Sequence, residues 1–425
     1  MSVFILLCAF FILLILGAPV AIALFLSSIA YFIYSGQDPF MASQAMVMSI
    51  GNSFTLLAIP LFTLAGIIMN TGGITEKIFH FANCMVKHIT GGMGHTNVAA
   101  SVIFSGMSGT AVADTSGLGA IELKAMRDAG YKENFSLAVT GASSIIGPII
   151  PPSVPAVLYA VIAGVSVGQI FVAGIVPGIL LSVSLSLFIW YRCKKEGLVP
   201  DPKASRKQRW EAFKGAFWAL LTPVIIIGGI ISGVFTPTES AVIAVFYALG
   251  LSLFSGEITL RKLPSLVTEA SKIVVGVLFI VASSAMFAWI LTIEQVPTMI
   301  ADAFSSNIPN VFVALIAINI ILLICGSFLE TIAALTILTP ILLPLASSYG
   351  IDPVHFGIIM ILNLMIGLLT PPMGMVLYVL SSVGKVEVDQ IVKAILPYII
   401  LFIFIVLFLS FFPAVVMTLP GLVFN

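Results

Sequence analysis

Long apolar runs recur throughout this sequence and constrain its fold more than any other feature. A bilayer crossing needs about 20 mostly apolar residues, and runs near that length lie at 168–191, 216–234, 237–254 and 272–293. Hydrophobic residues make up 60% of the chain and charged residues 8%, so a soluble domain could not hide this apolar surface. The expected fold class is an all-α polytopic membrane protein, because a β-barrel would show short alternating segments instead.

Basic residues predict which side of the membrane the loops face. All 18 Lys and Arg residues fall in five clusters, at 77–87, 124–132, 192–214, 261–272 and 385–393. Cytoplasmic loops are enriched in Lys and Arg, so we expect these clusters in the cytoplasm. The segments expected outside are 36–54, 234–237, 294–310, 350–355 and 419–425. Residues 1–35 are expected to form two short spans divided at 17–19, with the N-terminus outside.

Two apolar regions do not fit this charge pattern as crossings. Residues 96–123 begin and end beside basic clusters, whereas 311–349 begin and end at segments without Lys or Arg. Each is predicted to enter the membrane and return on the same side, as a re-entrant helical hairpin. Such backbone is tolerated only inside protein or beside a water-filled cavity.

Two diproline segments match each other position by position. GPIIPPSVP (147–155) and GLLTPPMG (367–374) place Gly147 opposite Gly367 and Pro151 opposite Pro371, with one constant offset in residue number. A proline inside a helix costs about 3 kcal/mol, so the matched pairs predict two broken helices. With hairpins that open to opposite faces, they predict inverted repeats, an architecture common in secondary transporters. The alternative is a pair of packing kinks.

The hairpin tips and helix breaks are the predicted site. Breaks free carbonyl oxygens for a cation and create helix N-termini that favour an anion. The tips contain small and hydroxyl-bearing residues, namely Gly106, Ser108, Gly109 and Thr110 in the first and Gly326, Ser327, Glu330 and Thr331 in the second. We expect the first tip to pair with the first break and the second with the second. Close helix packing is the competing explanation for these small residues.

Three acidic residues lie in apolar surroundings. Asp114 is expected to cap the first hairpin or to neutralise a cation, because ionisable groups within membranes are functional candidates. Glu239 is expected to be structural, with Thr236 as the helix N-cap, and the role of Glu330 stays open. No Lys or Arg occurs in either hairpin or break. An anionic substrate would therefore need helix N-termini, hydroxyls and co-bound cations.

Several strings resemble the large membrane subunit of tripartite ATP-independent periplasmic (TRAP) transporters. They are SGMSGTAVADTSGLGAIELKAMRDAGY (105–131), IIPPSVPAVLYA (149–160), GGIISGVFTPTESAVIAVFYAL (228–249) and LTPPMGMVLY (369–378). The resemblance implies a sodium-coupled, elevator-type importer in the bacterial inner membrane, closest to the sialic acid branch, with C4-dicarboxylates as the alternative. It also implies a small four-helix membrane subunit on a separate chain and a periplasmic substrate-binding protein. Nucleic acid is not an expected partner.

The resemblance carries site roles onto particular residues. The implied sodium ligands are Ser105, Gly106, Ser108, Gly109, Thr110, Gly147 and Pro148 in the first repeat, and Gly326, Ser327, Thr331, Gly367 and Thr370 in the second. The implied substrate neighbours are Ser143, Ser144, Pro152, Asn363 and Met373. Asp114 and Glu330 are candidates for a charge role, and Na⁺ as coupling ion is the only cofactor expected.

The resemblance also implies a division into moving and static parts. Repeats 54–165 and 257–385 would form the elevator, with amphipathic stretches 73–90 and 257–272 as arms. Segments 1–53, 166–256 and 386–425 would form the scaffold, which includes the basic loop 192–214.

Three other functions compete with the symporter. An ATP-driven permease would need a cytoplasmic coupling helix, which the polar, irregular segment 192–214 does not support. An intramembrane enzyme would need paired acids, a metal cluster or a Ser/His site at usable spacing, and the sequence has none, so we expect no enzyme. A passive channel also accommodates re-entrant hairpins, and only coupling to an ion gradient separates it from a symporter.

Overall fold

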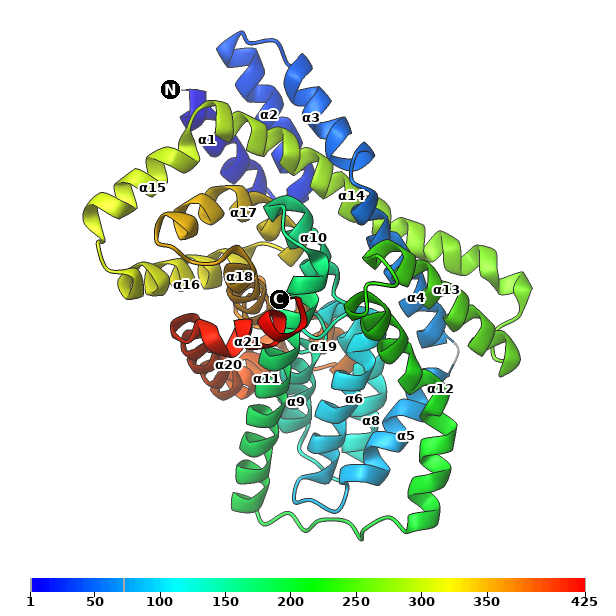
Figure 1. Ribbon diagram of the computed structural model, residues 1–425. Helices are drawn as coiled ribbons and strands as arrows, with labels where there is room; N and C mark the ends of the chain where they lie inside the picture. The colour runs from blue at the N-terminus through cyan, green and yellow to red at the C-terminus, as the bar shows by residue number, and fades with distance from the viewer. Residues whose placement is uncertain (1, 72, 425) are drawn as a thin grey trace.

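The computed structural model describes residues 2–71 and 73–424, without the side chains of 106–108. Every regular element in this part of the chain is helical (Figure 1). The helices are α1 (Ser2–Ile15), α2 (Val20–Ser35), α3 (Phe40–Gly51), α4 (Ala58–Thr71), α5 (Ile74–Val86), α6 (Gly92–Ser108), α7 (Ala111–Ser116), α8 (Leu118–Asp128), α9 (Glu133–Ser144), α10 (Val154–Ala163), α11 (Val167–Lys195), α12 (Arg206–Ile231), α13 (Pro237–Phe254), α14 (Leu263–Ile293), α15 (Val296–Asn307), α16 (Val311–Phe328), α17 (Thr331–Ser348), α18 (Pro353–Gly367), α19 (Met375–Gly384), α20 (Val388–Phe411) and α21 (Pro413–Phe424), with 3-10 turns η1 (Phe54–Leu57) and η2 (Leu260–Lys262). Among the described residues, eight helical segments are long and apolar enough to cross a membrane. The all-α fold class is confirmed.

Left-handed backbone conformations mark equivalent positions in the two halves of the chain. Positive φ angles occur in pairs with nearly equal separations along the sequence, at Gly73 and Gln295, Gly130 and Gly350, and Gly164 and Lys385. The first pair precedes the short helices α5 and α15, the second follows the hairpins, and the third follows α10 and α19. The repeated order of elements therefore covers short helix, hairpin and broken helix in both halves.

The two broken helices pack against each other at the centre of the molecule. A Cβ placed on Gly357 of α18 would overlap the ring of Tyr159 on α10. The Tyr159 hydroxyl also donates a hydrogen bond of 2.6 Å to the carbonyl of Pro353. Because only a residue without a side chain permits this approach, Gly357 fixes how closely the two halves meet.

Helices α11 and α20 pack directly on this centre. A Cβ on Gly174 of α11 would overlap the carbonyl oxygen of Ile149, within the first break. On the other side, Nε2 of His355 in α18 lies 2.9 Å from the carbonyl oxygen of Leu409 in α20. We expected both helices in a scaffold, and that division stays a prediction. The structure shows only that both helices pack directly on the broken helices.

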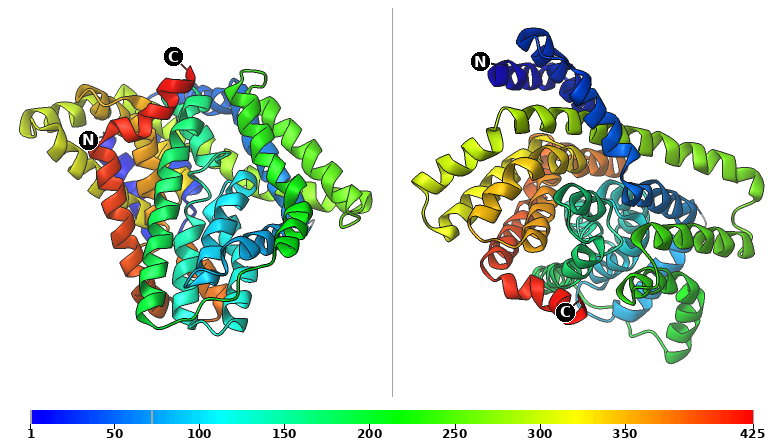
Figure 2. Two further views of the ribbon diagram at one scale, coloured as in Figure 1. Left: turned by 60° about the horizontal axis from the view of Figure 1, so that its bottom comes forward. Right: turned by 45° about the horizontal axis from the view of Figure 1, so that its top comes forward.

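The long helix α14 corrects one expectation. Residues 257–272 were expected as an arm separate from a span at 272–293, but α14 runs without interruption from Leu263 to Ile293. No proline follows Pro264 in this stretch, and Lys272 lies on an exposed face where a charged side chain does not end a helix. Figures 1 and 2 show α14 along one side of the molecule, between α2–α3 and the second hairpin's α17, with α4 also beside it. By repeat position, the counterpart of α5 is α15.

Other boundaries also differ from those expected. The segments 36–54 and 294–310, predicted to lie outside because they lack Lys and Arg, contain the helices α3 and α15. The last long helix ends at Phe411 rather than 418, and α21 follows from Pro413. Residues 1–35 do form two helices, divided at Leu16–Pro19. Which side the N-terminus occupies stays a prediction.

Candidate functional site: two tip–break junctions

The first hairpin turns at two residues. Helix α6 ends at Ser108, Gly109 adopts φ +61°, and the Thr110 hydroxyl accepts a hydrogen bond of 3.3 Å from the Ala113 amide to cap α7. We expected Gly106 and Ser108 in the non-helical tip as well, but their backbone continues the last turn of α6. Their side chains lie outside the described part. The returning arm is itself divided at Gly117 into α7 and α8.

The first tip lies against the first break, which spans residues 145–153. A Cβ on Gly109 would lie 3.3 Å from the Pro152 carbonyl oxygen, and one on Gly147 would lie 3.7 Å from a carboxylate oxygen of Asp114. Ser153 then caps α10 by accepting a hydrogen bond of 3.2 Å from the Ala156 amide. The predicted pairing of tip with break is confirmed here. We call this region the first junction.

The second tip, at Leu329 and Glu330, lies against the second break, residues 368–374. A Cβ on Gly367 would overlap the carbonyl carbon of Gly326. The Met373 amide donates a hydrogen bond of 3.1 Å to the Ser327 carbonyl. This is the second junction, and it confirms the second pairing. In both breaks the diproline peptide bond is cis.

Hydroxyl oxygens at the junctions retain lone pairs. Ser105 and Ser327 each donate their proton to a carbonyl of their own helix, at 2.5 and 2.8 Å, and Thr370 in the second break donates its proton to the carbonyl of Ile366 on α18, at 2.9 Å. A hydroxyl has one donor and two acceptor sites, so such an oxygen remains available to a cation. Thr331 is 3% exposed, and its hydroxyl has no hydrogen-bond partner among the described residues. Hard cations prefer oxygen ligands, so this donor set fits Na⁺.

The three acidic residues occupy different environments. Asp114 is 2% exposed, and neither carboxylate oxygen has a hydrogen-bond partner in the described chain. Glu330 instead caps α17 by accepting hydrogen bonds of 3.0 and 3.3 Å from the amides of Ile332 and Ala333. Glu239 forms a capping box with Thr236, as expected. A buried carboxylate without a partner is costly, so among these three acids Asp114 is the one whose negative charge has no compensating group in the described chain. Sequence reasoning missed a second buried acid, Glu122.

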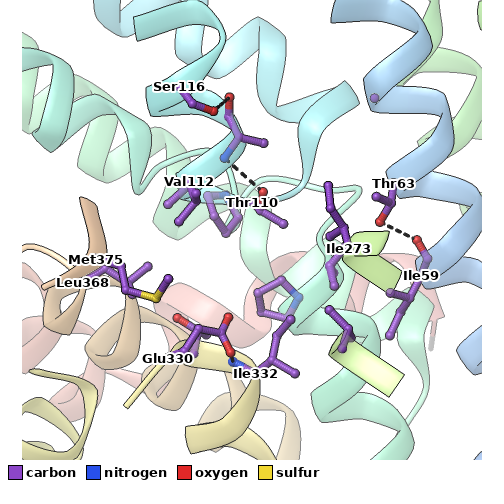
Figure 3. Close-up of a pocket in the computed structure, with 18 of the residues that line it drawn as sticks. Ile59, Thr63, Thr110, Val112, Ser116, Ile273, Glu330, Ile332, Leu368 and Met375 are labelled. Carbon is purple, nitrogen blue, oxygen red and sulfur yellow. Dashed lines mark hydrogen bonds between the residues drawn. The ribbon is translucent and has the colours of Figure 1, made fainter. Parts of the chain in front are cut away.

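A cavity of about 370 Å³ lies between the two tips. Figure 3 shows Thr110, Val112 and Ser116 of the first hairpin on one side, facing Glu330 and Ile332 of the second. Helices α4 and α14 and parts of both broken helices complete the wall, including Pro148 and Leu368 of the two breaks. Among the described residues, the lining contains Glu269 and Glu330 but no Lys, Arg or His. An organic anion in this cavity would meet no cationic side chain.

The five residues expected near the substrate do not line this cavity. Ser143 and Asn363 are both fully buried. The side chain of each forms a hydrogen bond from its broken helix to the hairpin of the same repeat. Their partners are Asn97 and Asn319, which sequence reasoning missed. The sequence did contain a signal for these partners, because each predicted hairpin has a single asparagine, which lies several residues before its tip. Ser144 is also buried, Met373 is exposed, and Pro152 lies beside the first tip.

Comparison with known proteins decides the family. The family described as "Tripartite ATP-independent periplasmic transporter, DctM component" matches residues 7–415. The chain belongs to this family of TRAP transporter permeases. It is therefore a transporter component rather than an enzyme, and a multi-pass protein of the inner membrane.

Individual TRAP permeases are similar along nearly the whole chain. The sialic acid TRAP transporter large permease protein SiaM of Vibrio cholerae is 46% identical over 96% of this chain and 95% of that protein. The sialic acid TRAP transporter permease protein SiaT of Haemophilus influenzae is 41% identical over 99% of this chain and 68% of that protein. The crystal structure of the Alcanivorax borkumensis YdaH transporter has a TM-score of 0.60 at 13% identity, covers 86% of this chain and 87% of that chain, and shares the fold.

Proposed function

We propose that this TRAP permease imports an organic acid anion, with sialic acid as the first candidate, and that an inward Na⁺ gradient drives the import. The cavity between the tips is the observation that carries the proposal. Its described lining supplies negative charge and no cationic side chain, so a carboxylate entering it would be repelled. Cations bound at the two junctions would offset that repulsion. Each Na⁺ moving down the membrane potential contributes about 2.3 kcal/mol per 100 mV.

Substrate choice rests on likeness to named relatives. The two relatives above carry sialic acid in their names, at 46% and 41% identity. A 2,3-diketo-L-gulonate TRAP permease of Escherichia coli is 37% identical, and a C4-dicarboxylate TRAP permease of Pseudomonas aeruginosa is 36% identical. Sialic acid is thus preferred, and a C4-dicarboxylate is the alternative.

The mechanism we propose is an elevator. The hairpins and broken helices, with α11 and α20 packed on them, would move as one body. The short helices α5 and α15 would be its arms, because each follows a left-handed hinge residue at an equivalent position. The hairpins would re-enter the membrane from opposite faces, with the basic clusters in the cytoplasm. A small membrane subunit and a periplasmic substrate-binding protein would complete the transporter.

Uptake into proteoliposomes tests this function. The complete transporter should accumulate sialic acid only under an inward Na⁺ gradient, and an excess of unlabelled succinate should not compete. Uptake that persists after the Na⁺ gradient is collapsed would reject sodium coupling. Competition by succinate but not by unlabelled sialic acid would favour the dicarboxylate alternative.

A further inference from the structure

Two buried asparagines occupy matching places on the entering helices of the two hairpins. Asn97 lies on α6 and is 0% exposed, and Asn319 lies on α16 and is 2% exposed. Given the 1.5 Å rise per helical residue, each lies about 15–18 Å along its helix from the tip. Neither asparagine can therefore reach the tip of its own hairpin.

In the first repeat, Asn97 joins the hairpin to α9. Its Nδ2 donates a hydrogen bond of 2.8 Å to the Thr140 hydroxyl, and its Oδ1 accepts one of 2.5 Å from the Ser143 hydroxyl. Thr140 and Ser143 lie one turn apart on the same face of α9. Both ends of the amide are thus used, and both partners belong to the broken helix that ends at the first junction.

In the second repeat, Asn319 joins three elements. Its Oδ1 accepts a hydrogen bond of 2.7 Å from Nδ2 of Asn363 on α18, and its Nδ2 donates one of 3.1 Å to the Ser410 hydroxyl on α20. Asn363 corresponds to Ser143 of the first repeat, because the offset that aligns the diprolines also aligns these two positions. The two hydrogen-bond sets, which we call the first and second clasp, recur although their residues differ.

We propose that Asn97 and Asn319 are positioning residues that set the affinity of the junctions for Na⁺ without touching the ion. The inference rests on the proposed sodium coupling. Apolar packing between a hairpin and a broken helix is non-directional, whereas a buried hydrogen bond fixes direction and distance. Each clasp therefore holds its hairpin in axial register with its broken helix. That register places the tip oxygens opposite the break oxygens.

At the tip of each hairpin, backbone groups of the tip also lie directly against backbone groups of the break. In the second repeat, the amide of Met373 reaches the Ser327 carbonyl at 3.1 Å, and Gly326 touches Gly367. In the first, Gly109 lies against the Pro152 carbonyl. A slip of one helix along the other would separate these backbone groups. Ion affinity should fall even though every junction residue is unchanged.

The test replaces a whole clasp with apolar side chains. In the complete transporter, Asn97→Leu with Thr140→Val and Ser143→Ala removes every partner together, so no buried polar group is left unpaired. The second-clasp variant combines Asn319→Leu, Asn363→Leu and Ser410→Ala. As a control, Ser28→Ala removes a buried hydroxyl that bonds only within α2, at 2.8 Å to Leu24.

The readout is the Na⁺ concentration that half-saturates thermal stabilisation of the purified transporter, measured without substrate. We expect each clasp variant to raise it by roughly fivefold or more, while the melting temperature without Na⁺ stays near that of the Ser28→Ala control. A clasp variant with unchanged Na⁺ dependence overturns the positioning role, even if it is less stable. If the unaltered transporter shows no stabilisation by Na⁺, sodium coupling itself fails, and the positioning role with it.

The single variants Asn97→Leu and Asn319→Leu keep the result interpretable if a triple variant does not fold. They leave every other clasp residue in place, including the substrate candidates Ser143 and Asn363. The same rise in half-saturating Na⁺ is expected, with the half-saturating substrate concentration unchanged at high Na⁺. If only the half-saturating substrate concentration rises, the proposal is overturned, and the result points to direct substrate contact through the neighbouring residues.

Discussion

The first and second junctions share one order of elements but are held together by different contacts. The second closes through backbone, with Gly326 against Gly367 and the amide of Met373 on the Ser327 carbonyl. The first junction is packed less tightly, because a Cβ on Gly109 would lie 3.3 Å from the Pro152 carbonyl oxygen. It also holds a buried carboxylate, Asp114, without a hydrogen-bond partner in the described chain. The halves therefore repeat their architecture without repeating their chemistry. We expect the first junction to depend on charge and the second on close packing.

The largest effect should come from packing at the second junction. Gly367→Ala would put a Cβ into the backbone of Gly326, which forces the tip and the break apart. Overpacking of this kind costs about 1–3 kcal/mol, and we expect uptake to be lost. Gly276→Ala, which meets nothing within 4 Å, is the matched control. Uptake and thermal stability are measured for both variants, to test whether the tip and the break must stay in contact. Normal uptake by Gly367→Ala would show that the junction need not stay closed.

Charge at the first junction should have the next largest effect. Asp114→Asn removes the unpartnered carboxylate, so we expect the half-saturating Na⁺ concentration for uptake to rise by about tenfold, equal to about 1.4 kcal/mol. Glu330→Gln should change it far less, because the amide oxygen can still accept the hydrogen bonds that cap α17. Equal effects of the two variants in an Na⁺ titration of uptake would contradict the assigned difference.

The helix caps beside the first junction should have the smallest effect. Thr110→Ala removes the cap of α7, and Ser153→Ala removes the cap of α10. Lost caps cost about 1 kcal/mol each. We expect a modest fall in melting temperature, with uptake retained when Na⁺ is saturating. Loss of uptake at saturating Na⁺ would instead mean that these hydroxyls bind ion or substrate directly.

The sequence predicted the junctions better than the parts around them. The charge pattern separated the two hairpins from crossings, and glycine-rich tips and matched diprolines have strong local effects on the backbone, so both hairpins, both breaks and their pairing could be predicted from residues alone. The limits of α3 and α15 could not, because a segment without Lys or Arg looks the same whether it forms a loop or a short helix. The continuity of α14 was missed because Lys272, read as part of a loop, lies on an exposed helix face.

The clasps show a second limit. Asn97 and Ser143 are far apart in the sequence, and nothing in their local sequence tells that they face each other. Only the repeat could have pointed to them, through the isolated asparagine at the same place in each half. Ser143 and Asn363 were singled out for the substrate, but the structure buries them in these hydrogen bonds. Direct contact with substrate therefore has no support from the cavity lining.

Labelling of one cysteine at the base of each hairpin tests the central claim, that two equivalent halves face opposite sides of the membrane. In a background without the four native cysteines, Ala129→Cys follows α8 and Ser348→Cys ends α17, both at exposed positions. An impermeant maleimide added to intact spheroplasts should label Ser348→Cys at once and Ala129→Cys only after permeabilisation. Labelling of both cysteines from the same side would contradict the inverted arrangement on which the two junctions depend.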